Sequence, residues 1–162
     1  MNENNNLFRE GTAMIETPQE LIDATILKVE SVLKEKFDEY ESYGSGTFTI
    51  SRGSTQVMVL VRPFTEHETC VECIANVVYG AEINADLMNF LLRRNAEIHF
   101  GAFGLLFDNT IVFQHTITGT NLDANELYTS VNSVAIIADY YDDEIVEKFG
   151  GKRSTDNEFG EL

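Results

Sequence analysis

The stretch from Ile98 to Thr118 is predicted to form two β-strands joined by a tight turn at Asp108-Asn109, and it is apolar on both faces. Because strand side chains alternate with period two, one face of this hairpin should carry an outer set of four side chains: Phe103, Leu105, Phe107 and Val112. A sheet with one solvated face cannot satisfy such a pattern. A helix should therefore cover one face of the hairpin, and a second element or a partner should cover the other face.

The remaining segments predict an α+β fold. Apolar residues at intervals of three and four predict a first helix, capped at Thr17 and ending before Gly44, and helices over 84–95 and 123–149. Strand patterns cover 47–52, 55–63 and 68–79. Together with the hairpin they predict a five-stranded antiparallel sheet flanked by helices, in the order α-β-β-β-α-β-β-α.

Length and composition predict a single domain. The chain has 162 residues, of which 43% are hydrophobic, enough for one core. We expect a flexible N-terminal segment over 1–16, a domain over 17–151 and a flexible acidic tail over 152–162.

The formal net charge of −16 disfavours nucleic acid and anionic membranes as partners, because both would be repelled. The sequence has no apolar run of about 18 residues and no basic-then-apolar signal pattern. Two cysteines fit a reducing compartment. We therefore expect a cytoplasmic protein.

Catalytic and metal-binding motifs are not indicated. Cys70 and Cys73 have redox-like spacing, but positions i and i+3 of a strand point to opposite faces. With Asp108-Asn109 as the turn, His99 lies opposite Thr118 and His115 opposite Ala102, so the two imidazoles diverge. His67 and the acidic run over 139–144 are interpreted as solvated groups. We predict no enzyme activity, no cofactor and no metal.

Two further patterns resemble a known family. The ending Ala138-Asp139-Tyr140-Tyr141-Asp142-Asp143-Glu144 and the run Leu87-Met88-Asn89-Phe90-Leu91-Leu92, followed by the Phe-rich hairpin, resemble the YbjN-like and type III secretion chaperone-like (CesT-type) family. The resemblance spans residues 17–151. It implies an antiparallel sheet flanked by helices, dimerisation and, in the secretion branch, binding of an extended segment of a client protein.

Two functional hypotheses follow. The first is a non-enzymatic protein- or peptide-binding domain acting as a homodimer, with a dimer or client surface formed by Leu91, Phe103, Leu105, Phe107 and Val112. In a variant of it, the first or third helix covers that surface within one chain. The second hypothesis is a small-molecule-sensing regulatory domain with a pocket between sheet and helices, lined by Tyr79, His99 and Tyr141.

Overall fold

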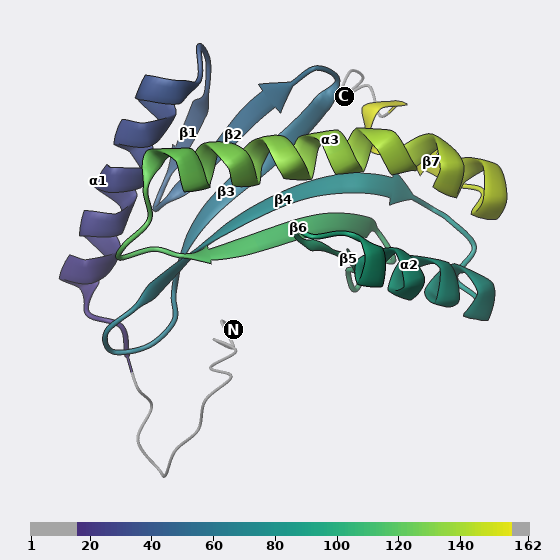
Figure 1. Cartoon of the computed structure of the whole chain (residues 1–162), viewed down its shortest axis with the longest axis horizontal. Helices are drawn as coiled ribbons and strands as arrows, with labels where there is room; N and C mark the ends of the chain where they lie inside the picture. The colour runs from purple at the N-terminus through teal and green to yellow at the C-terminus, as the bar shows by residue number, and fades with distance from the viewer. Residues whose placement is uncertain (1–15, 157–162) are drawn as a thin grey trace, which may run out of the picture.

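The computed structural model describes residues 16–156, which form one antiparallel sheet packed against helices (Figure 1). The described elements are, in chain order, α1 (Gln19–Lys36), β1 (Glu41–Gly44), β2 (Thr47–Arg52), β3 (Thr55–Pro63), β4 (Thr69–Tyr79), α2 (Ala85–Glu97), β5 (Ala102–Leu105), β6 (Ile111–Thr118), α3 (Ala124–Phe149), β7 (Lys152–Arg153) and the 3₁₀ helix η1 (Ser154–Asp156). The predicted α+β class is confirmed. The sheet has seven strands rather than the predicted five, because β1 and β7 were not expected.

The strands are ordered β1-β2-β3-β4-β6-β5, and the short β7 pairs with the end of β4. Each pairing is antiparallel. The predicted β2 and β3 boundaries agree with the structure, and Gly53-Ser54 forms their two-residue turn between Arg52 and Thr55. The sheet therefore ends in two different edges, β1 on one side and β5 on the other.

The helices cover one face of the sheet, and α3 runs across the middle strands (Figure 1). Strand β4 alternates accordingly, with its helix-facing residues fully buried and the residues between them partly exposed. The helix-facing β4 core residues are Val71, Cys73, Ala75 and Val77. Leu60 and Val112 are also buried, but they lie outside this core cluster, on the opposite face.

Helix α1 is shorter than predicted. It ends at Lys36, although Phe37 and Tyr40 continue the apolar spacing. Both aromatic rings pack inward from the extended connection after the helix, on Tyr128 and Phe48 respectively. The predicted cap at Thr17 is also wrong, because the Thr17 hydroxyl instead bonds the backbone of Phe64 and Thr65.

The predicted register of the β5–β6 hairpin is wrong by one residue. Phe103 lies opposite Phe113 rather than Gln114, because the turn contains three residues, 107–109, instead of two. Asn109 has φ 66°, and the Leu106 amide donates to the Thr110 carbonyl at 2.9 Å. This geometry is typical of three-residue hairpin loops. A one-residue shift in register moves each β6 side chain to the opposite face of the sheet relative to the β5 side chains.

The caps predicted for α2 and α3 are confirmed. The Asn84 side chain accepts a hydrogen bond from the Leu87 amide, and the Asp123 side chain accepts one from Glu126. Helix α3 ends at Phe149 with Gly150 as its C-cap, after which the chain turns back to form β7 and η1. Lys152–Asp156 are thus part of the fold, within the segment expected to be a flexible tail; residues 1–15 and 157–162 lie outside the described residues.

Candidate functional site

The five residues predicted to form a dimer or client surface do not share one surface. Leu91, Phe103 and Val112 are buried within the chain. Phe103 packs edge-on against Phe113 and Tyr141, so α3 covers it intramolecularly. Val112 lies on the opposite face of the sheet, paired with Gly104.

Leu105 and Phe107 remain accessible, and they belong to a larger group of exposed apolar side chains. Leu105 is 37% exposed and Phe107 is fully exposed at the tip of the turn. Five of the eleven exposed large apolar residues of the described chain fall within one short stretch from α2 to this turn: Leu92, Phe100, Leu105, Leu106 and Phe107. We call these five residues the turn cluster. Leu105, Leu106 and Phe107 lie at the turn end of β5, whereas Phe100 lies at its other end beside His115, and Leu92 lies on α2.

The free edge of β5 is closed by a side chain of α2. The Asn95 Oδ1 atom accepts from the Phe103 amide at 2.7 Å, and its Nδ2 atom donates to the Phe103 carbonyl at 3.2 Å. An asparagine side chain thus takes the place of a neighbouring strand. No motif in the sequence indicated this role.

The face of the sheet without helices combines polar positions with a narrow apolar centre. Met58 pairs with Ile74, and Leu60 lies beside Glu72. Arg62 forms an ion pair with Glu72 at 3.7 Å on the same face. This face is therefore suited to solvent or to a partner of mixed polarity.

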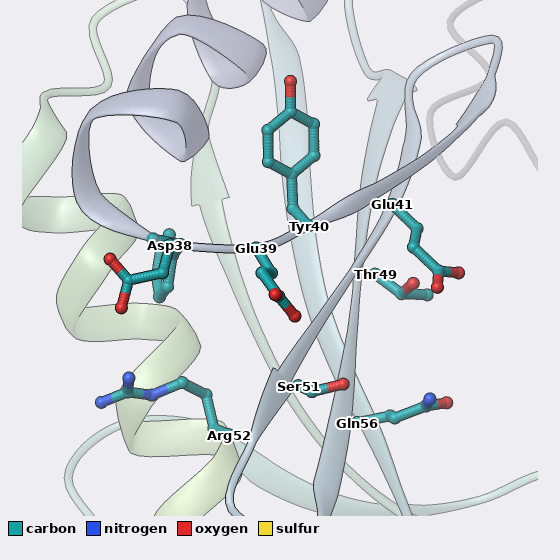
Figure 2. Close-up of a pocket in the computed structure, with 9 residues that line it drawn as sticks. Asp38, Glu39, Tyr40, Glu41, Thr49, Ser51, Arg52 and Gln56 are labelled. Atoms are coloured by element: carbon teal, nitrogen blue, oxygen red, sulfur yellow. The ribbon is translucent and has the colours of Figure 1, made fainter.

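A groove of about 720 Å³ opens beside the end of β2. It separates the connection after α1 from β2 and is lined by Phe37, Asp38, Glu39, Tyr40, Glu41, Thr49, Ser51, Arg52 and Gln56 (Figure 2). Its polar side chains have no catalytic arrangement. No sequence pattern indicated the groove, because β1 was not predicted.

The side chains of the connecting segment point in alternating directions. In Figure 2 the Glu39 side chain extends toward the β2 side, whereas the Tyr40 ring points away. The Tyr40 hydroxyl donates to Glu30 of α1 at 3.1 Å. Between residues 16 and 156, neither Asp38, Glu39 nor Arg52 takes part in an ion pair. The groove therefore presents unpaired charges.

The other candidate groups do not form a site. Cys70 and Cys73 are free thiols, and burial raises the pKa of Cys73 to about 12, which makes it unreactive. Within the described residues, no group of three or more His, Cys, Asp and Glu side chains could hold a metal ion.

The aromatic side chains predicted to line a small-molecule pocket pack separately. Tyr79 accepts a hydrogen bond from Asn76, whereas Tyr141 packs on Phe103 and Tyr140. No ring contact in the described part of the chain joins Tyr79, His99 and Tyr141 to one another.

None of the helices over residues 16–156 is long and apolar enough to cross a membrane.

The fold defines a small α+β protein with an antiparallel sheet covered by helices on one face. Comparison with family models identifies the family, because residues 19–157 match the model of the T3SS (YopN, CesT) and YbjN peptide-binding chaperones. The chain belongs to this family. The resemblance inferred from sequence is confirmed. No curated protein sequence matches the chain.

Solved structures support the same fold. The chain is similar to the ExsC–ExsE complex, with a TM-score of 0.56, 12% identity and coverage of 76% of this chain and 93% of that chain. It is also similar to the Yersinia pestis type III secretion chaperone SycH in complex with a stable fragment of YscM2, with a TM-score of 0.50, 16% identity and coverage of 72% and 98%. At these identities, the similarity shows the fold alone.

Proposed function

We propose that this chain is a non-enzymatic chaperone that binds an extended peptide segment of a client protein and acts as a homodimer. The observation that carries the proposal is the set of exposed apolar side chains of the turn cluster, on a chain that belongs to a peptide-binding family. Both similar structures are complexes, one of ExsC with ExsE and the other of SycH with a stable fragment of YscM2. The free thiols of Cys70 and Cys73 support a reducing, cytoplasmic location.

A second copy is the proposed partner of the turn cluster. Phe107 projects fully from the turn, with no other described residue covering it. Burying one large apolar side chain contributes roughly 1.5–3 kcal/mol, and association costs about 4–15 kcal/mol. Burial of the most exposed of these side chains, Phe107 and Leu92, in both subunits therefore favours association.

Sedimentation equilibrium tests the dimer with Phe107→Glu. We expect a dimeric wild type and a monomeric variant that melts at the wild-type temperature, because Phe107 makes little contact within its own chain. Leu27→Glu is the matched control, since Leu27 is equally apolar and 68% exposed on α1. A monomeric wild type, or an unchanged dimer in Phe107→Glu, would refute this assignment.

Peptide binding is tested with a display library of unstructured 15-residue segments. We expect selected peptides to bind the purified protein in fluorescence anisotropy and to become protected from protease. Their protected parts should be extended rather than helical by circular dichroism. Failure to select any peptide that binds above the level of a scrambled sequence would refute the chaperone proposal.

A further inference from the structure

We propose that residues 83–100, which comprise α2 and its two connections, form a flap that opens while the sheet and α3 stay folded. Arg94 is the clamp that holds this flap closed. The inference does not depend on the proposed peptide binding or dimerisation. It follows from how little of α2 is buried, from where the ends of the flap are fixed and from the contacts between Arg94 and α3.

Helix α2 is held by few buried side chains. It lies beside β5 at the edge of the molecule (Figure 1). Leu87 and Leu91 are its buried residues, whereas the buried residues of α3 extend from Leu127 to Ile145. A segment with few buried contacts opens at a lower free energy than the whole fold. A helix of this length is marginal in water by itself, so α2 should lose its helical hydrogen bonds when it detaches.

Both ends of the flap are fixed to the rest of the fold. Before the flap, the Glu82 amide donates to the Phe149 carbonyl at 2.9 Å. After the flap, Gly101 has φ 93° and lies so close to β6 that a Cβ would be 2.6 Å from the Gln114 carbonyl oxygen. Opening is therefore confined to the residues between these two points.

Arg94 connects α2 to α3 through both charge and ring contacts. Its Cζ atom lies 5.0 Å from the centroid of the Phe90 ring and 5.9 Å from that of Tyr141. Its guanidinium also forms ion pairs with Glu97 of α2 at 2.8 Å and with Glu144 of α3 at 3.6 Å. Because the Arg94 and Glu144 side chains are 30% and 29% exposed, salt should weaken the attraction between them.

The hydrogen bonding of Arg94 is incomplete. Its Nε atom is buried and has no hydrogen-bond partner among the described residues. A buried donor without an acceptor raises the free energy of the closed state, and opening exposes this donor to water. The closed flap is therefore separated from the open flap by less free energy than a fully satisfied contact would provide.

Opening of the flap uncovers aromatic rings of α3. In the closed flap the Phe90 and Phe149 rings lie with their centroids 5.6 Å apart, and Arg94 covers Tyr141. Both Tyr141 and Phe149 are only partly buried and pack against the hydrophobic core. The flap thus determines whether this aromatic surface of α3 is accessible.

Hydrogen exchange measured by mass spectrometry on the full-length protein tests the flap. Raising sodium chloride from about 20 mM to about 500 mM should speed exchange of the α2 amides about 2- to 5-fold, because screening weakens the clamp. Exchange of the β3 amides should not become faster, since β3 lies in the part of the fold that stays closed. Equal responses of α2 and β3 would show that α2 opens only with the whole fold, which would overturn the inference.

Substitutions in α2 test the clamp under the same conditions. Arg94→Gln should speed exchange of the α2 amides about 3- to 10-fold at low salt and should remove most of their salt dependence. Arg93→Gln is the matched control, because it removes the same charge from the next position of the same helix. Arg93 is exposed and forms no ion pair with any residue from 16 to 156. Equal exchange of α2 in the two variants would mean that Arg94 is not the clamp.

Two further readouts separate the clamp from a general loss of stability. Arg94→Lys keeps the charge but not the planar guanidinium that stacks on the rings, so its α2 amides should exchange at a rate between those of wild type and Arg94→Gln. The β3 amides of Arg94→Gln should exchange as in the wild type. A parallel increase in β3 exchange would show that Arg94 stabilises the whole fold, and the flap would then be wrong.

Discussion

Asn95 of α2 holds the backbone of Phe103 through both atoms of its side-chain amide, with distances of 2.7 and 3.2 Å. These two hydrogen bonds join α2 to β5, the strand at one edge of the sheet. The Phe103 ring packs against Tyr141 of α3, so the Asn95 contact to Phe103 connects α2 and β5 with α3. Three residues of the turn cluster, Leu105, Leu106 and Phe107, follow this anchored position.

Asn95→Ala should lower the free energy of unfolding by about 1–2 kcal/mol, because two partly buried hydrogen bonds are lost. Urea denaturation measures the change, and hydrogen exchange should show a faster Phe103 amide. Asn132→Ala on α3 is the control, since it removes one local bond to the Tyr128 carbonyl with the same change in helix propensity. Equal effects of the two substitutions would contradict a specific role for Asn95.

Glu68 links the start of β4 to the end of β6. Its carboxylate accepts from the Gly119 and Thr120 amides and from the Thr120 hydroxyl. Burial alone would raise the pKa of Glu68, but the hydrogen bonds from Thr120, and those from the Thr69 and Gly119 amides, outweigh it and lower the pKa. The ionised carboxylate is therefore more stable in the folded state than in the unfolded state.

Glu68→Gln should destabilise the protein at neutral pH by about 1 kcal/mol. The stabilisation by a carboxylate with a lowered pKa is complete above its unfolded value, about 4.3, and is lost as pH falls through the folded value. The stability gap between wild type and Glu68→Gln should thus narrow below about pH 4.3. Urea titrations between pH 7 and 3 measure it, with Glu147→Gln as the control; a constant gap would contradict the assignment.

The sequence predicted the fold class, two helix caps and the β2–β3 hairpin because each depends on local signals. Local signals do not determine the register of the β5–β6 hairpin, because Asp108-Asn109 is compatible with a two-residue or a three-residue turn. The three-residue turn places Phe103 under α3 and Val112 on the other face, which divides the predicted surface. Only Leu105 and Phe107 of that surface are exposed.

Other features of the candidate sites depend on contacts between distant residues. Helix α1 was predicted too long because Phe37 and Tyr40 pack inward from an extended segment at helical spacing. Strand β1 is exposed throughout and has no apolar alternation to reveal it. The groove at Ser51 depends on where β1 begins, and the role of Asn95 depends on how α2 packs beside β5.

Asp142 is a buried carboxylate on α3, only 6% exposed. Burial raises its pKa, and the nearby carboxylates of Asp143 and Asp139 add to the increase, although the Asp143 amide and Arg153 oppose it. A raised pKa in the folded state means that the ionised form destabilises the fold as pH rises above the unfolded value, about 3.9.

Asp142→Asn should therefore raise the melting temperature at pH 7 by a few degrees. The difference in melting temperature between Asp142→Asn and the wild type should decrease as pH falls toward about 4, where Asp142 becomes protonated in both the folded and the unfolded state. Calorimetry at pH 7, 5.5 and 4 measures this, with Glu147→Gln as a charge-matched control on the same helix. A lower melting temperature for Asp142→Asn at pH 7 would show that its charge is stabilising.

Gly119 permits a close approach between the end of β6 and the start of β4. Its amide donates to the Thr69 carbonyl, and a Cβ at this position would lie 2.1 Å from Thr69 Oγ1. Thr69 cannot move away easily, because it is fully buried and its hydroxyl lies 2.8 Å from that of Thr25. Gly119→Ala should therefore destabilise the protein by about 1–3 kcal/mol through overpacking.

A double-mutant cycle separates this steric effect from a loss of backbone freedom. Thr69→Ala removes the obstructing hydroxyl, while Thr25 keeps its bond to the Leu21 carbonyl. The double variant should be more stable than the sum of the two single effects predicts. Gly104→Ala is the control, because its Cβ would lie 3.3 Å from one Val112 methyl group and should cost less. Additive effects in urea denaturation would mean that Gly119 is required for its backbone and not for the space beside Thr69.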